Sequence, residues 1–276
     1  MPFFEDVDSI RIVQRNIERL QAVEESRAKK MVRLMIQARE SIRTRLTEVR
    51  EDSYTEAQLE IALAQVDQIL SEFRVKANAL AYADSEIIIE QSVDDLAREV
   101  SKFSKEFQGL GVSIPVDQIL TSLNSKNYLL NRYQSSVDSY TNGFRDFIER
   151  ELGQAILSKE GNFRIVNRIA DEWALKDWQI MRIVRTELHH IYNMAKNESM
   201  IQVKESTIPE LQKALIHPMD ARTGEDSKKA DRLNLVVDID QPFKYTFKGK
   251  ERVFFTPPDR PNDRSIQVPY SKAWDN

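Results

Sequence analysis

The sequence predicts a mainly α-helical protein that ends in a small α+β module. Residues 3–108 contain neither glycine nor proline, whereas seven of the nine prolines lie between residues 209 and 269. Helix interiors disfavour both residues, by about 1 kcal/mol for glycine and about 3 kcal/mol for proline. Alternating strand-like sequence appears only near the C-terminus. We therefore expect a long N-terminal α-helical hairpin in a first domain, 1–110. A second domain, 111–276, would hold helices over 115–200 and an α+β module with a short antiparallel sheet over 201–276.

Composition narrows the class of protein. The 276 residues are 41% hydrophobic and 30% charged, with a net charge of −4 and no cysteine. This balance does not indicate a general polyanion binder, which usually carries excess lysine and arginine. The absence of cysteine excludes disulfides, thiolate metal sites and a cysteine nucleophile, and it fits a reducing cytoplasm. No segment has the roughly 20 apolar residues of a membrane span, and the N-terminus does not resemble a secretory signal. We expect a soluble protein.

The first helix should run from about Glu5 to Arg50. Its apolar residues recur in steps of three and four, which places them on one stripe. Residues 51–56 are predicted to form the turn, where Ser53 and Glu56 have the spacing of a capping box. The stripe consists of Ile10, Val13, Ile17, Leu20, Met31, Met35, Ala38, Ile42, Leu46 and Val49.

The second helix carries two apolar runs that are out of phase. The first run is a heptad-like seam from Leu59 to Leu80, and the second extends from Ile89 to Phe107. The phase changes between Ala81 and Ile88. We expect a kink, a local change of winding or a change of packing partner there.

Charge is segregated along the predicted hairpin. A solvated helix face is the simpler interpretation, but a basic strip could also contact nucleic acid or an acidic neighbour in an assembly. The candidate nucleic-acid or partner strip consists of Arg27, Lys29, Lys30, Arg33, Arg39 and Arg43, and the opposing acidic residues are Asp84, Glu86, Glu90, Asp94, Asp95 and Glu99.

Shorter helices are predicted after the hairpin, over 115–123, 125–140 and 143–158, followed by a helix over 163–175 and a turn at 174–177. The helix after Trp178 has a buried side that includes Ile180, Val184 and Leu188. Strands are predicted over 233–239, 243–247, 252–255 and 265–268, with a hairpin turn at 248–250. We expect this sheet to pack on the Trp178 helix.

Two polar motifs follow Trp178 and suggest a structural network. Arginine provides a forked donor that matches a carboxylate. We expect Glu187 and Asp220 to pair with Arg222 and Arg185, which would fix the helix to the C-terminal module. A functional site is the alternative. The motif residues are Arg182, Arg185, Thr186, Glu187, Asp220, Arg222 and Thr223.

These motifs resemble the head-morphogenesis, or minor head protein, family typified by the F protein of phage Mu. The resemblance covers about residues 163–268 and rests on Arg182-x-x-Arg-Thr-Glu187, Tyr192-Asn193, Asp220-x-Arg-Thr223 and the closing segment from Phe254 to Ser265. It implies a non-enzymatic minor capsid protein, made in the host cytoplasm and present in the virion head. The implied partners are the portal protein, the major capsid protein, further copies of the chain and the packaged DNA, with no membrane while in the head. The implied role is head assembly or genome delivery.

One departure from the family limits the site chemistry. Asn262-Asp-Arg-Ser265 replaces the family's Asn-Cys-Arg-Cys, so a metal site or cross-link cannot form by that route.

Other chemistry has weak support in the sequence. His189 and His190 are adjacent and point about 100° apart on a helix, so they cannot chelate one ion together. One of them with His217 and Asp220 could form a metal site, but satisfied polar histidines are the favoured interpretation. No glycine-rich phosphate loop or nucleophile elbow occurs. We therefore expect no metal, cofactor or catalytic residue. Two alternatives remain: DNA binding by the basic strip in residues 27–50, and an enzyme centred on Arg185, Glu187, His217 and Asp220.

Overall fold

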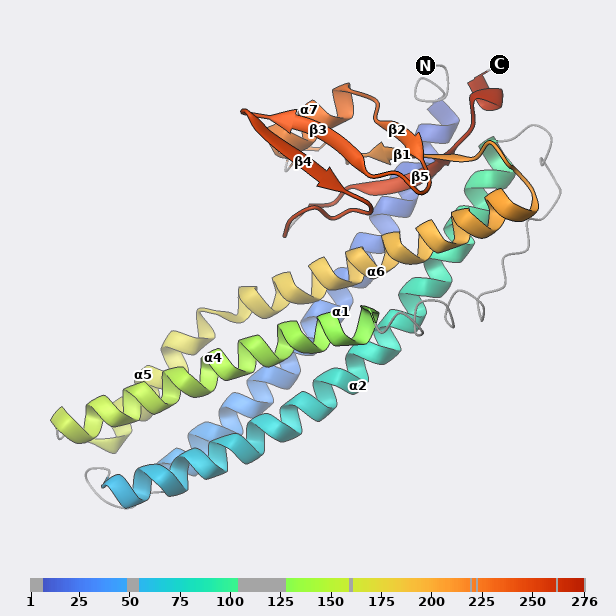
Figure 1. Ribbon diagram of the computed structural model, residues 1–276. Coiled ribbons are helices and arrows are strands. Elements are labelled where there is room, and N and C mark those ends of the chain that lie inside the picture. The colour runs from blue at the N-terminus through green and yellow to red at the C-terminus, as the bar shows by residue number, and fades with distance from the viewer. Residues whose placement is uncertain are drawn as a thin grey trace. The chain divides into compact units, whose positions relative to one another are not determined.

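The computed structural model describes residues 7–48, 55–103, 128–158, 161–218, 220–221, 223–261 and 263–275, and it confirms the predicted fold class. Long helices are followed by a small antiparallel sheet (Figure 1). Among the described residues, no helix is both long enough and apolar enough to cross a bilayer. The long helices are α1 Val7–Thr47, α2 Glu56–Phe103, α4 Tyr128–Ser158, α5 Asn162–Ala174 and α6 Asp177–Ser206.

The chain forms two compact units that do not follow the predicted division at residue 110. Unit 1 comprises Met1–Glu24, Asp84–Leu129 and Arg185–Asn276, and unit 2 comprises Glu25–Ala83 and Leu130–Val184. Helices α1, α2 and α6 contribute residues to both units. The boundary within α2 lies in the stretch where the apolar phase changes. A change of packing partner therefore accounts for the phase shift, while α2 continues as one helix.

Unit 2 is held by α4 packed against its neighbours. Trp173 of α5 stacks on Phe144 of α4 with 4.2 Å between ring centroids. Arg74 of α2 donates to Thr141 at 2.8 Å, and Arg145 of α4 pairs with Asp67 at 3.2 Å, so α2 and α4 are antiparallel. These contacts hold the middle of α4 against α2 and α5.

The predicted break between 140 and 143 is wrong, because α4 continues through Gly143 as a single helix. One glycine costs a helix only about 1 kcal/mol, which the burial of the flanking Tyr140, Phe144 and Phe147 outweighs. The predicted helix over 115–123 lies outside the described residues.

The start of α2 uses a different capping box from the predicted one. The Thr55 backbone N–H donates to the Gln58 side chain at 2.8 Å, and the Gln58 N–H donates to the Thr55 hydroxyl at 3.4 Å. This reciprocal pair has the Thr-x-x-Gln form of the motif. Ser53 lies outside the described residues.

The C-terminal module contains a three-stranded antiparallel sheet and a separate hairpin. The strand order of the sheet is β2-β1-β5, and β3 pairs with β4. The hairpin turns at Lys248 and Gly249, whose φ values of 49° and 75° suit a two-residue turn. The elements are β1 Gln212–Ile216, α7 Glu225–Arg232, β2 Val236–Asp238, β3 Phe243–Phe247, β4 Lys250–Phe254, β5 Ile266–Tyr270 and the 3-10 helix η2 Lys272–Asp275.

Strand β1 is the central strand of the sheet and was not predicted. Its sequence Gln-Lys-Ala-Leu-Ile does not alternate between polar and apolar residues, and Lys213, Ala214 and Leu215 are all buried. Lys213 is accommodated by donating to the Phe255 carbonyl at 2.8 Å. A strand covered on both faces loses the period of two that identifies a half-buried strand.

Candidate functional site: a buried polar layer in unit 1

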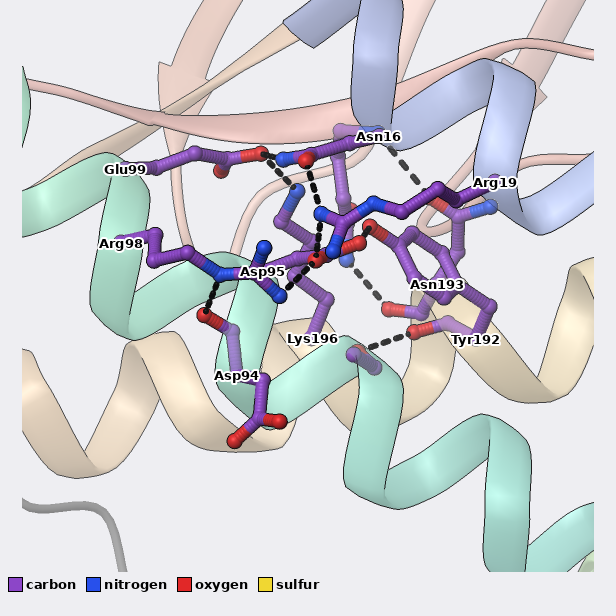
Figure 2. Close-up of polar contacts among 11 residues, drawn as sticks. Asn16, Arg19, Asp94, Asp95, Arg98, Glu99, Tyr192, Asn193 and Lys196 are labelled. Atoms are coloured by element: carbon purple, nitrogen blue, oxygen red, sulfur yellow. Dashed lines mark hydrogen bonds and ion pairs between the residues drawn. The ribbon is translucent and has the colours of Figure 1, made fainter. Parts of the chain in front are cut away.

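Helices α1, α2 and α6 meet in unit 1 through polar side chains rather than through a purely apolar core. Figure 2 shows these side chains converging from the three helices. Asn16 of α1 donates to Glu99 of α2 at 2.7 Å, and Arg19 donates to Asp95 at 2.5 Å. The α1 numbers rise as the α2 numbers fall, so these two helices are antiparallel here.

Asp95 is the centre of the first group of contacts. Its side chain is fully buried, and Oδ1 accepts from Arg19 at 2.5 Å and from Arg98 at 2.9 Å. Its other oxygen accepts from the Tyr192 hydroxyl of α6 at 2.8 Å. Burial and the nearby Asp95 carboxylate raise the pKa of Tyr192 well above its ordinary value, so the hydroxyl remains a donor. Both Asp95 oxygens are therefore paired.

Glu99 and Lys196 form a fully buried ion pair one helical turn away. Lys196 Nζ lies 2.7 Å from Glu99 Oε1, and both side chains are 0% exposed. Burial raises the pKa of Glu99 above its ordinary value, although Lys196 and the Asn16 amide oppose this shift. Such a pair contributes little net stability compared with apolar packing, but losing one partner is costly. It therefore fixes the register between α2 and α6.

A second group of contacts joins α1 and α6 to the segment before β5. His189 Nδ1 lies 2.8 Å from Glu24 Oε1, and His189 Nε2 lies 2.6 Å from the Ser265 carbonyl oxygen. A carbonyl only accepts, so Nε2 carries a proton. Burial opposes a charge on this ring, but Glu24 and the Ser265 carbonyl together raise the pKa of His189 above its ordinary value. His189 thus lies buried between two acceptors that favour its protonated form.

Ser265 also contacts His217, and the direction of this hydrogen bond decides whether Ser265 has the geometry of a nucleophile. The Ser265 hydroxyl donates to Asp263, and His217 Nδ1 lies 2.6 Å from the same hydroxyl oxygen. Burial opposes the charge on Asp263, but the hydrogen bond from Ser265 lowers its pKa, so it remains an acceptor. The hydroxyl proton is thus engaged, and His217 must donate through Nδ1. Burial lowers the pKa of His217 to about 4, so the ring is neutral.

This geometry is not that of a serine nucleophile. A nucleophilic serine donates its proton to an imidazole nitrogen, whereas Ser265 donates to Asp263 and accepts from His217. Ser265 is also 0% exposed. The arrangement orders the chain before β5.

Asn193 connects α6 directly to β5. Its side-chain oxygen accepts from the Gln267 backbone N–H at 2.9 Å, and its amide donates to the His189 carbonyl at 3.0 Å. The Gln267 side chain returns a hydrogen bond to the Asn193 carbonyl at 2.5 Å. Amide and imidazole groups, which were not predicted to do so, thus join the helix to β5 and the segment before it.

The structure describes only some of the residues in the predicted polar network. Asp220 forms a two-pronged pair with Arg264, with both N–O distances 2.7 Å, and its backbone N–H donates to the Thr223 hydroxyl at 3.1 Å. Arg264 was not among the predicted partners. Arg222 lies outside the described residues. The pairing of Arg185 and Glu187 with Asp220 and Arg222 therefore stays a prediction.

Two further members of that predicted set are placed individually. Arg182 belongs to unit 2, where its guanidinium lies 4.7 Å from the centroid of the Trp178 ring. The Thr186 hydroxyl is buried and has no hydrogen-bond partner among the described residues. Neither residue is seen to join the contacts of Asp220.

The predicted basic strip is not exposed along its whole length. Arg39 is mostly buried in an ion pair with Asp177 at 2.6 Å, and Arg43 donates to Asn167 at 3.2 Å. Arg27 is half-buried, whereas Lys29, Lys30 and Arg33 are exposed. The exposed part of the strip therefore consists of Lys29, Lys30 and Arg33.

The opposing acidic patch is wrong as a surface feature, since half of its members are interior. The buried members are Asp84, Asp95 and Glu99, and only Glu90 and Asp94 are fully exposed. Helical periodicity alone did not identify which carboxylates face the other helices.

Residues that were considered for a metal site or an enzyme centre contact different partners. His217 contacts Ser265, and Asp220 contacts Arg264. Within the described ranges, no group of three or more histidine, aspartate or glutamate side chains is placed to hold a metal ion.

Sequence reasoning missed the residues that hold this layer together. His189 was expected to be a satisfied polar histidine but was assigned no partner, and Asn193 was named only as part of a motif. Ser265 and Arg264 were quoted only within the closing segment. The available signal was the run of polar residues on the apolar side of α6, where His189, Asn193 and Lys196 follow steps of three and four.

Comparison with family models, curated proteins and solved structures finds no match to this chain.

Proposed function

We propose that this chain is a structural minor head protein of a tailed phage, which docks on the portal or capsid and acts in head assembly or genome delivery. The observation that carries the proposal is the meeting of three separate motifs in one module. Asn193 contacts Ser265 and Gln267, and Asp220 contacts Arg264. Three of the quoted motifs are thus joined through the closing segment.

The chemistry of the layer supports a structural role. Its carboxylates Asp95, Glu99 and Glu24 each have a cationic or hydrogen-bonding partner, and His189 is 1% exposed. A reaction centre needs groups that a substrate can reach. Buried groups that bridge three helices and a sheet instead specify one arrangement of the elements.

Purified particles test this proposal directly. Mass spectrometry of phage heads and procapsids should detect the chain at low copy number relative to the major capsid protein. Cryo-electron microscopy without imposed icosahedral symmetry should then place it at the portal vertex. Its absence from both heads and procapsids would refute the proposal.

DNA binding remains the second candidate because Lys29, Lys30 and Arg33 are exposed within about one turn and a half of α1. A variant with all three residues changed to glutamine should lose DNA binding if the strip is used. Binding should also weaken steeply with salt, because cations that contact phosphates release counterions. If wild-type protein does not retard duplex DNA at low salt, this candidate is removed.

A further inference from the structure

A groove in unit 1 is lined by Arg19 and Arg98, the two arginines that bind the buried Asp95. It has a volume of about 600 Å³ and is bordered by residues from α1 and α2. Four cations line it, together with aliphatic side chains of the α1 face; these lining residues are Arg15, Arg19, Arg98, Lys102, Ile12 and Ala22. The groove combines positive charge with apolar surface.

The cations form two rows with helical spacing. Arg15 and Arg19 are four residues apart on α1, and Arg98 and Lys102 are four residues apart on α2, so each pair lies on one side of its helix. Carboxylates four residues apart on a partner helix have the same spacing. Two such rows therefore match the acidic side of an amphipathic helix.

Two of the four cations are held in place by Asp95. Arg19 and Arg98 both bind Asp95 Oδ1, while 41% and 50% of their side chains stay exposed (Figure 2). Guanidinium groups have five donors, so each can bind a further carboxylate while it keeps Asp95. Because they are already ordered, binding would cost less side-chain entropy.

The other two cations are Arg15 and Lys102. Within the described part of the chain, the side chains of Arg15 and Lys102 make no ion pair, and both residues are exposed. Among the described residues, Glu18 is the only anion that lines the groove. Four positive side chains and one negative side chain therefore line the groove.

We propose that this groove binds an acidic amphipathic helix of a partner protein. The aliphatic side chains Ile12 and Ala22 favour a peptide over a nucleic acid, because a phosphate backbone offers no apolar surface to cover them. A long polyanion would also pass the exposed Asp94 and Glu90, which lie four and eight residues before Arg98 on α2. The inference does not depend on a role in a phage head.

Binding of a labelled peptide to the full chain tests the inference. The probe is a fluorescein-labelled peptide of about 18 residues, long enough to form a helix, with glutamate pairs at i,i+4 and leucine on the adjacent positions. Its partner probe has every glutamate replaced by glutamine. Fluorescence anisotropy should show that only the acidic peptide binds, and that binding weakens as salt is raised.

Charge reversal separates the groove from general electrostatics. Arg15→Glu with Lys102→Glu should raise the Kd for the acidic peptide at least tenfold, whereas Lys29→Glu with Lys30→Glu in unit 2 makes the same change in net charge and should leave it within about twofold. Arg19 and Arg98 are left intact because they hold Asp95. Circular dichroism checks that both variants fold; if the groove variant does not, neutral Arg15→Gln with Lys102→Gln replaces it.

Three results would overturn the inference. The acidic peptide could fail to bind wild-type protein, or the two variant pairs could weaken it equally. Alternatively, labelled duplex DNA could bind in a manner sensitive to Arg15 and Lys102 while the peptide does not, which would assign the groove to nucleic acid.

Discussion

Removing Lys196 should expose the dependence of unit 1 on its buried charges. Lys196→Met keeps the length of the side chain but leaves Glu99 without its cation in a site that is 0% exposed. Breaking a buried pair from one side typically costs about 3–5 kcal/mol. Glu99→Gln leaves the complementary charge and should cost a similar amount. Each single variant is therefore expected to destabilise unit 1 strongly at pH 7.

The double variant distinguishes pairing from packing. Lys196→Met with Glu99→Gln removes both charges and keeps an oxygen to accept from Asn16, which lies 2.7 Å away. Its expected cost is about 1–3 kcal/mol, that of one buried unsatisfied group. The single effects should thus sum to far more than the effect of the double variant.

Hydrogen exchange of peptides covering residues 92–103 and 188–203 measures the local free energy of opening in unit 1, alongside guanidinium unfolding followed by circular dichroism. Lys228→Met is the matched control, since Lys228 pairs with the exposed Glu225 at 3.1 Å and its loss should have no measurable effect. Single variants that cost less than about 1 kcal/mol, or a double variant equal to their sum, would show that the pair is not what fixes α2 against α6.

The effect of Lys196→Met should also depend on pH. Burial already raises the pKa of Glu99, and removing Lys196 removes an opposing influence. A carboxyl whose folded pKa exceeds its unfolded value binds protons more tightly in the folded state, so stability rises as pH falls. The deficit of the variant should therefore shrink as pH falls from 7 toward the ordinary value of 4.5. A constant deficit over this range would contradict an ionised, buried Glu99.

Three further predictions address the contacts between α6, the sheet and the turns. Asn193→Asp keeps the side-chain shape but replaces the donor facing the Ser265 carbonyl, so guanidinium unfolding should show a loss of about 3 kcal/mol. His217 has a folded pKa of about 4 and an ordinary value of 6.5, so it stays neutral while the unfolded chain takes up a proton. Stability should therefore fall by about 3 kcal/mol between pH 6.5 and 4. The variant His217→Asn should reduce that fall. Gly249→Ala, at φ 75°, should lower the thermal midpoint by the equivalent of about 1 kcal/mol, whereas Gly143→Ala in open space within α4 should raise it, and equal effects would contradict the assigned backbone.

The sequence by itself determined the class of fold because that information is local. The absence of glycine and proline from residues 3–108 indicated helices, and apolar steps of three and four identified the buried side of α1, apart from Ile10, which is 48% exposed. The alternation in Phe243–Phe247 and the Lys248–Gly249 turn likewise specified the β3–β4 hairpin. The out-of-phase runs in α2 indicated a change near residues 81–88, of which a new packing partner was one of three explanations, and the boundary between the units lies there.

Only the tertiary structure decided which polar side chains are interior. Asp95 and Glu99 belong to a run of acidic residues whose spacing is compatible with a solvated face, and they are buried because Arg19, Tyr192 and Lys196 approach them from other helices. Strand β1 was hidden for the same reason, since burial on both faces removed its alternation. Periodicity reports the side of an element that is apolar, whereas the burial of a charge depends on partners that are distant in the sequence.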